Sequence, residues 1–188
     1  MKDEGFEAQR FVVLVLILLA GVLLSSCGNN PGECPESYLP SFQSQYGGGN
    51  SILLRQNSTE WTSIDVSADR IIDAVHSISF NLDFDSTKMT YDGYLMGTFF
   101  EQNGSHTSYA VNLDPGNDHK IIVNISQDGS GNAATGSGII VTLKFKLIAE
   151  GTSSISFSND HLLDSNGQEI TIDGWLGTDI IISRAKCL

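Results

Sequence analysis

The stretch SISFNLDFD, from Ser77 to Asp85, alternates apolar and polar side chains without a break. The side chains of Ile78, Phe80, Leu82 and Phe84 therefore share one face of an extended chain, while serine, asparagine and aspartate share the other. This period of two is typical of a β-strand with one face in a core and the other in water. The stretch decides the fold class, because similar short segments recur on both sides of it.

Several other segments show the same alternation, and none between them has a convincing helical period. Strands are expected over 51–55, 61–66, 88–91, 109–113, 121–125, 139–147, 154–157 and 178–183. The runs DPGN at 114–117 and DSNG at 164–167 are turn sequences, since aspartate, proline and glycine favour tight reversals. Short strands at regular spacing predict a nine-stranded antiparallel β-sandwich with jelly-roll topology.

The N-terminal sequence predicts that the protein is exported. Residues 11–24 are apolar except for Gly21, too short for a usual spanning helix and typical of a signal-peptide core. The following Leu24-Ser25-Ser26-Cys27 resembles the lipobox of bacterial lipoproteins, a resemblance that implies cleavage before Cys27 and lipidation of its thiol. The acidic residues among the first ten depart from the usual basic start, and an uncleaved anchor helix is the alternative.

These features divide the chain into residues 1–26 as signal peptide, residues 27–50 as lipidated cysteine and flexible tether, and residues 51–188 as the sandwich domain. The tether assignment follows from its prolines and its run of three glycines. The residue after Cys27 is Gly28 rather than aspartate, and in a diderm bacterium the lipoprotein sorting pattern would then point to the outer membrane. The expected location is therefore the cell envelope.

Charge and cysteine content bound the function further. The formal net charge is −12, which is a poor match for nucleic acid because phosphates require lysine and arginine. Two cysteines remain besides Cys27, near the two ends of the mature chain. In an oxidising compartment the simplest prediction is a disulfide between Cys34 and Cys187, with free or intermolecularly paired thiols as the alternative.

No catalytic or metal-binding constellation is recognisable, so we expect no enzymatic activity and no cofactor. The four histidines are scattered, and no nucleophile elbow occurs. The turns at Asp114–Asp118 and Asp164–Glu169 contain oxygen ligands but do not match an EF-hand loop. Asx-turns explain both, and a structural calcium in one of them is the alternative.

Four segments together resemble cohesin domains, over about residues 50–184. They are VHSISFNLDFDSTKMTYDG at 75–93, GSGI at 136–139, LKFKLIAEGTSSISF at 143–157 and LDSNGQEI at 163–170. The first is similar to the third cohesin strand and its aromatic-Asp-Pro turn, although Phe84-Asp85-Ser86 lacks the proline. The resemblance implies a nine-stranded jelly roll, related to cellulose-binding modules, that binds dockerins through a flat sheet face. It also implies adjacent first and last strands, which supports the pairing of Cys34 with Cys187.

The resemblance also implies where a partner would bind. Type I cohesins carry asparagine and aspartate contacts on the third strand, at positions that Ser77 and Ser79 occupy here. The same strand face presents Asn81 and Asp83, and Lys144 and Lys146 point outward from the strand at 139–147, on this sheet or on the opposite one. We therefore expect a protein partner, dockerin-bearing or other, at a membrane-anchored module. These residues are the candidate partner-binding set: Ser77, Ser79, Asn81, Asp83, Lys144 and Lys146.

Two alternative functions remain open at this point. A carbohydrate-binding module linked to polysaccharide breakdown is favoured by the kinship in fold and by clustered aromatics, because aromatic side chains form sugar platforms. The candidate platform, expected in a loop, consists of Tyr91, Tyr94, Phe99 and Phe100. A structural or adhesion lipoprotein of the envelope is the other alternative. A row of aromatics on one sheet would favour sugar, whereas a polar sheet would favour protein.

Overall fold

A computed structural model describes residues 37–43, 47–59, 62–102, 106–129 and 133–185. In this part of the chain almost all regular structure is β, with one short 3-10 helix, η1 (Phe99–Glu101). The strands in chain order are β1 (Tyr38–Phe42), β2 (Ser51–Gln56), β3 (Ser63–Val75), β4 (Ser77–Asp83), β5 (Met89–Met96), β6 (Thr107–Asp114), β7 (Asn117–Gln127), β8 (Ala134–Leu147), β9 (Gly151–Leu163), β10 (Gly174–Leu176) and β11 (Thr178–Arg184).

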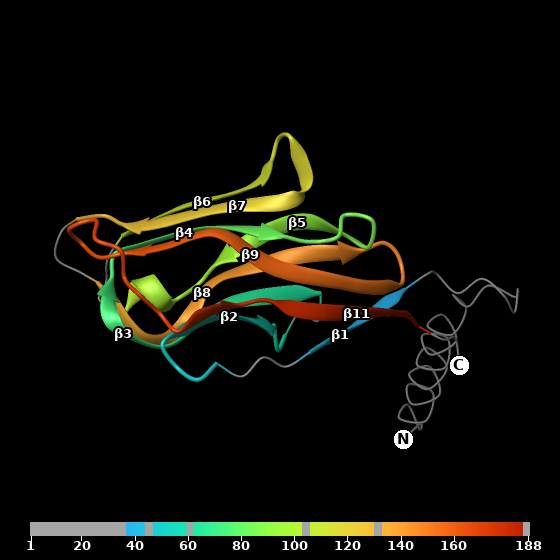
Figure 1. Cartoon of the computed structure of the whole chain (residues 1–188). Coiled ribbons are helices and arrows are strands. Elements are labelled where there is room, and N and C mark those ends of the chain that lie inside the picture. Colours follow the sequence, from blue (N-terminus) through green and yellow to red (C-terminus); the bar gives the residue numbers. More distant parts are fainter. Residues whose placement is uncertain (1–36, 44–46, 60–61, 103–105, 130–132, 186–188) are drawn as a thin grey trace, which may run out of the picture. The chain divides into compact units, whose positions relative to one another are not determined.

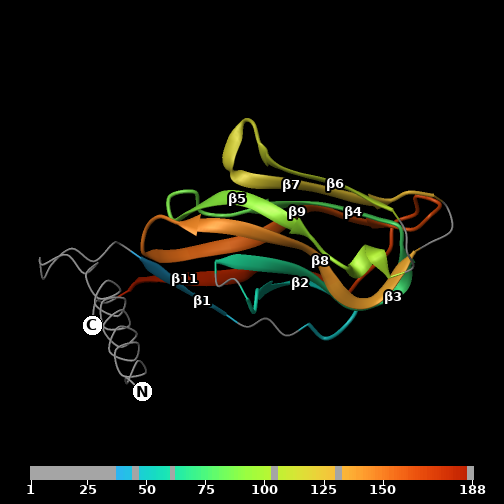
Figure 2. The ribbon, with the colours of Figure 1, turned by 180° about the vertical axis from the view of Figure 1, so that it is seen from behind.

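The strands form two sheets that face each other (Figures 1 and 2). The six-stranded sheet has the order β1-β11-β9-β4-β7-β6, and the five-stranded sheet has the order β10-β2-β3-β8-β5. The predicted all-β sandwich is confirmed. The described part of the chain holds eleven strands, however, where nine were expected, and one pair, β10 with β2, is parallel.

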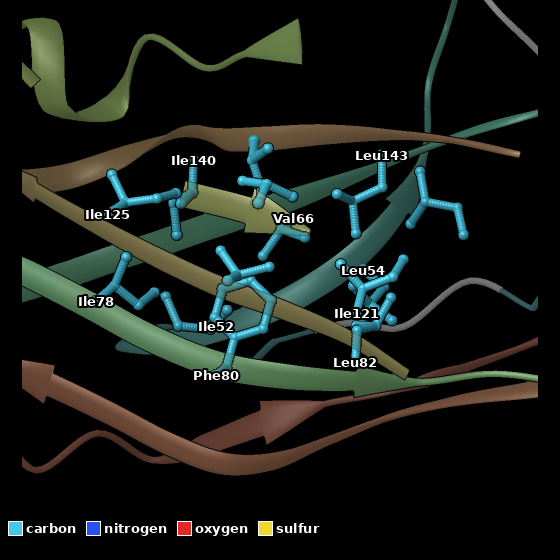
Figure 3. Packing of buried hydrophobic residues seen from close by; sticks show 14 of the residues in the cluster. Ile52, Leu54, Val66, Ile78, Phe80, Leu82, Ile121, Ile125, Ile140 and Leu143 are labelled. Atoms are coloured by element: carbon cyan, nitrogen blue, oxygen red, sulfur yellow. The ribbon is translucent and has the colours of Figure 1, made fainter. Parts of the chain in front are cut away.

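The core lies between the two sheets and follows from the alternation in each strand. From β4, the side chains of Ile78, Phe80 and Leu82 are buried there. They meet residues of the facing sheet such as Leu54 and Val66 (Figure 3). Full burial of one such side chain contributes about 1.5–3 kcal/mol. Because the apolar face of β4 points inward, its polar face must point to solvent.

A turn after β4 carries the chain from one sheet to the other. The backbone N–H and the hydroxyl of Thr87 both donate to Asp85 Oδ1, at 2.9 and 2.6 Å. These two hydrogen bonds favour the ionised carboxylate and lower the pKa of Asp85. This Asx-turn closes the reversal at the position where the family pattern has a proline. The preceding Phe84 is buried and anchors the turn in the core.

The sandwich begins closer to the N-terminus than residue 51, which corrects the expected tether boundary. Strand β1, inside the segment expected to be tether, pairs with β11, and Tyr38 lies opposite Arg184. The Ala185 N–H donates to the Ser37 carbonyl at 2.8 Å and extends this pairing. The signal peptide, Cys27, Cys34 and Cys187 all lie outside the described residues. Within the described ranges, no helix is long and apolar enough to cross a membrane.

Candidate partner-binding surface

The outer surface of four adjacent strands, β9, β4, β7 and β6, forms what we call the polar face. Its members are the side chains that alternate with core residues along these strands. The strand register arranges them in rows across the sheet. The polar face consists of Leu163, His161, Ser158 and Ser156 from β9, Ser77, Ser79, Asn81 and Asp83 from β4, Ser126, Asn124, Ile122 and Lys120 from β7, and Ser108, Ala110 and Asn112 from β6.

The structure places four of the predicted partner-binding residues together at the centre of this face. Ser77, Ser79, Asn81 and Asp83 all point outward from β4, and each is partly exposed. β4 is paired on both sides, with β7 and with β9, so these side chains are held on a rigid central strand. In the strand register, Ser79 lies opposite Asn124 of β7 and opposite His161 of β9.

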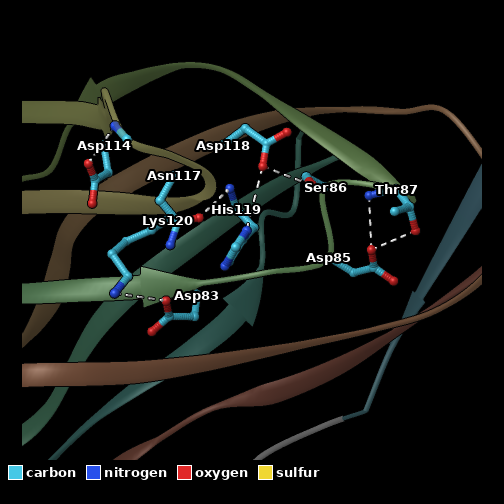
Figure 4. A network of polar contacts seen from close by, with 10 residues as sticks. Asp83, Asp85, Ser86, Thr87, Asp114, Asn117, Asp118, His119 and Lys120 are labelled. Carbon is cyan, nitrogen blue, oxygen red and sulfur yellow. Dashed lines mark hydrogen bonds and ion pairs between the residues drawn. The ribbon is translucent and has the colours of Figure 1, made fainter.

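The polar face carries an ion pair between Lys120 and Asp83, at the end of β4 away from Ser77. Lys120 Nζ lies 3.6 Å from Asp83 Oδ1 (Figure 4). The Ser158 hydroxyl donates to the other carboxylate oxygen of Asp83. Both charged side chains are partly exposed, so the interaction is screened by water. The opposite charges of Lys120 and Asp83 cancel. The rest of the face is made of neutral side chains and one histidine, His161.

Small side chains leave an open hollow in one half of the polar face. Its volume is about 390 Å³, and it opens to solvent. The outward side chains around it come from all four strands: Ser77, Ser79, Ser108, Ala110, Asn124, Ser126 and Leu163. The hollow exists because serine and alanine occupy positions where the other half of the face has asparagine, isoleucine, aspartate and lysine.

The other two predicted partner-binding residues lie elsewhere. Lys144 and Lys146 belong to β8, in the five-stranded sheet, and alternate there with the core residues Leu143 and Phe145. Lys146 Nζ contacts Asp92 Oδ1 at 2.6 Å, on the neighbouring strand β5. The six residues therefore do not form one surface, which the sequence left open because alternation does not identify the sheet.

The prediction that four aromatic residues form an exposed cluster in a loop is wrong. Phe99 and Phe100 are 1% and 0% exposed, because η1 directs both rings into the core. Tyr91 and Tyr94 lie on β5 rather than in a loop. Tyr91 packs edge-on against Phe145, and this burial raises its pKa to about 12. Only Tyr94 is appreciably exposed, at 36%, and its ring stacks on Tyr109.

The two turns considered for calcium are closed by their own carboxylates. Asp164 Oδ1 accepts from the N–H groups of Gln168 and Asn166, each at 2.8 Å. These bonds lower the pKa of Asp164. Asp114 Oδ1 accepts from the Gly116 N–H at 2.9 Å. The residues that the structure describes contain no group of three or more metal-ligating side chains. The calcium alternative stays a prediction.

Sequence reasoning missed most of the polar face outside β4. Asn124 and Ser126 belong to β7, and Ser108 and Ala110 to β6. Their alternation with apolar residues is visible in the sequence and identifies them as outward. Nothing in that local pattern shows that β6 and β7 lie beside β4, so the hollow they form with Ser77 was not predictable.

Two comparisons extend these observations to known sequences. A family model for the cohesin domain matches residues 62–178, which span most of the described sandwich. A comparison with the curated proteins finds no match.

Solved structures of cohesins share this fold at low sequence identity. A type II cohesin domain from the cellulosome of Acetivibrio cellulolyticus is 16% identical, with a TM-score of 0.59, and the match covers 71% of this chain and 95% of that chain. A non-cellulosomal cohesin from the hyperthermophilic archaeon Archaeoglobus fulgidus is 18% identical, with a TM-score of 0.51 and coverage of 70% and 89%. A chain of a type I cohesin–dockerin complex from Clostridium thermocellum is 13% identical, with a TM-score of 0.53 and coverage of 74% and 97%.

Proposed function

The chain belongs to the cohesin family, and from that premise we propose that it is a non-catalytic receptor for a protein partner. The partner, dockerin-bearing or other, binds on the polar face. The observation that carries this proposal is the combination of family membership with a wide face of mostly short, polar side chains on strands paired at both edges of β4. Such a face suits a protein surface better than a sugar, because it lacks the aromatic side chains on which sugar rings stack.

The Clostridium thermocellum structure is a cohesin–dockerin complex, and a dockerin is therefore the first partner to test. The residues at the family's third-strand contact positions are Ser77 and Ser79, which differ from asparagine and aspartate in size and charge. We therefore expect this chain to select a partner different from that of a type I cohesin.

The receptor is held at the cell envelope by a lipid anchor on Cys27, in this proposal. The support is the apolar run at 11–24 and the lipobox-like sequence that follows it. Several acyl chains on one cysteine give a stable anchor, because each buried methylene contributes about 0.8 kcal/mol. Mass spectrometry of the membrane-bound protein tests this anchor: its N-terminal peptide should begin at Cys27 and carry acyl chains, and Cys27→Ser should carry none. An unacylated native chain that retains residues 1–26 would instead support an uncleaved helix.

The partner proposal is tested with immobilised residues 28–188 and purified type I and type II dockerin modules, with a polysaccharide array in parallel. We expect one dockerin class to bind, and Ser77→Arg with Asn81→Arg to abolish that binding. Thr90→Arg is the matched control, since it places the same charge on an exposed outward position of β5 in the other sheet.

Three results would contradict the proposal. Glycan binding without a protein partner would support the carbohydrate-binding alternative, and Tyr94→Ala would then be the first variant to measure. Absence of binding in both arms would support a structural role in the envelope. Equal loss of dockerin binding in the β4 variant and in Thr90→Arg would place the interface outside the polar face.

A further inference from the structure

The hollow in the polar face has properties that specify the chemistry of a partner. It lies between β9, β4, β7 and β6, and opens to solvent along its length. An enclosed small-molecule site buries most of its ligand, whereas this one leaves an occupant open on one side. The shape therefore suits a side chain that projects from a second protein surface lying across the sheet.

The walls of the hollow are mostly carbon. Leu163 presents a partly exposed apolar side chain at one side, and Ala110 contributes a methyl group at the other. Ser108 has a hydroxyl, but that hydroxyl donates to Asp128 Oδ1 at 3.2 Å. An occupant that fills the hollow with apolar atoms would remove them from water, which favours binding.

The surroundings of the hollow are acidic. Asp128 is exposed next to Ser108, and Asp164 directly follows Leu163. Glu169 lies opposite Leu163 in an isolated β-bridge and contacts His161 at 3.3 Å. Among the residues that the structure describes, no lysine or arginine lines the hollow. On β7, Lys120 is four residues from Asn124 and pairs with Asp83.

We infer that the hollow receives one bulky apolar side chain of a protein partner, with a lysine or arginine beside it on the partner's surface. The apolar side chain is buried against Leu163 and Ala110, and the cation faces Asp128, Asp164 and Glu169. This inference rests on the proposed function and adds to it the chemical identity of the recognition element. A buried apolar anchor supplies affinity, and the surrounding charges supply orientation and association rate.

The test fills the hollow from the receptor side. The mature protein is purified in detergent, and its affinity is measured for the dockerin module that binds in the experiment above. Ala110→Trp should weaken binding at least 30-fold, roughly the effect of losing one hot-spot contact. Thr90→Trp is the matched control, since it adds the same ring at an exposed outward strand position on the other sheet. Both positions are exposed, and tryptophan is favoured in strands, so both variants should fold.

Two further measurements identify what occupies the hollow. Replacement of the partner's central apolar residue by alanine should weaken binding to the native receptor and cause no additional loss with Ala110→Trp, as expected for two groups in contact. Affinity should decrease with added salt, and Asp128→Asn should reduce that dependence, whereas Asp92→Asn on the other sheet should not.

The outcomes separate this inference from the proposed function. If Ser77→Arg with Asn81→Arg abolishes binding but Ala110→Trp binds like the native protein, the polar face is the interface and the hollow inference is wrong. Equal losses in Ala110→Trp and Thr90→Trp overturn it as well. If no dockerin module binds the native protein, the dockerin form of the proposed function fails, and the inference fails with it.

Discussion

The outer faces of the two sheets differ in how much of their polar surface is available to a partner. The polar face on β9, β4, β7 and β6 leaves its serine and asparagine side chains partly or fully exposed. On the five-stranded sheet, the outward residues Ser63, Asp65 and Ser67 of β3 are buried. Alternation alone makes the two faces look alike, since both place polar residues opposite the core.

Contacts within the chain explain the difference. Asp65 is 7% exposed, and its Oδ1 accepts from Thr142 Oγ1 at 2.6 Å and from Asn57 Nδ2 at 2.9 Å. Leu53 also points away from the core cluster, yet it is 0% exposed. Gly47 lies so close to the Leu53 side chain that an added methyl group would approach it within 2.9 Å. The five-stranded sheet uses these outward groups in contacts within the chain, whereas the polar face leaves its own polar groups exposed.

The largest effect on stability is expected at the edge of the six-stranded sheet that is remote from the hollow. Tyr38 lies opposite Arg184 in the β1–β11 pair. Cys34 precedes Tyr38 by four residues, and Cys187 follows Arg184 by three residues. We therefore expect these two cysteines to form a disulfide that stabilises the fold by roughly 4–5 kcal/mol in the chain-entropy model. The measurement is urea unfolding with and without reductant.

Alkylation and mass spectrometry provide the direct check. The unreduced protein should take up no alkyl group on Cys34 or Cys187, and the reduced protein should take up two. A Cys34→Ser variant should unfold at the same urea concentration with and without reductant. Two alkylations before reduction would contradict the prediction and would leave β1 held by its hydrogen bonds and by the packing of Tyr38 and Phe42 against the core.

The second prediction concerns the five-stranded sheet. Asp65→Ala should lower the free energy of unfolding by about 2–3 kcal/mol, because it removes the acceptor of the buried Thr142 hydroxyl and of the half-buried Asn57 amide. Thr142→Val removes only one of these donors and should have a smaller effect. Denaturant unfolding of both variants measures the difference. A loss below 0.5 kcal/mol for Asp65→Ala would mean that this face is not held together by its buried carboxylate.

The third prediction concerns the ion pair between Lys120 and Asp83 on the polar face. Lys120→Ala should cost less than about 1 kcal/mol, because Lys120 and Asp83 are 26% and 30% exposed in their side chains and water screens the pair. The same urea titration tests it beside Asp65→Ala. A loss as large as that of Asp65→Ala would remove the energetic distinction between the two faces.

The smallest effect is expected at the turn that joins the two sheets. The folded-state pKa of Asp85 is lowered, so its contribution to stability is present above the unfolded pKa of 3.8 and is lost as pH falls through the folded value. Stability should therefore decrease below pH 3.8, and Asp85→Asn should make that decrease shallower. Thermal unfolding over the acidic range provides the measurement. Identical acid profiles of the native protein and Asp85→Asn would show that the carboxylate does not contribute.

Much of the fold followed from the sequence because side-chain alternation is a local property. The segment at 77–85 identified a half-buried strand, and β4 has the predicted inward and outward residues. The turns at Asp114 and Asp164 were also predicted correctly, because the carboxylate that closes each one belongs to the turn itself. β1 was missed because its proline and the nearby glycines are typical of a tether, and only pairing with β11 makes it a strand.

The candidate site also has a part that follows from local alternation and a part that depends on long-range strand pairing. The sequence by itself determined which residues of β4 face outward, since parity along an extended chain requires no partner strand. Only the tertiary structure decided that Lys144 and Lys146 lie on the other sheet, that Phe99 and Phe100 enter the core, and that β6 and β7 complete a hollow beside Ser77. The physical reason is that strand neighbours are chosen by long-range burial and hydrogen bonding, which depend on the whole chain.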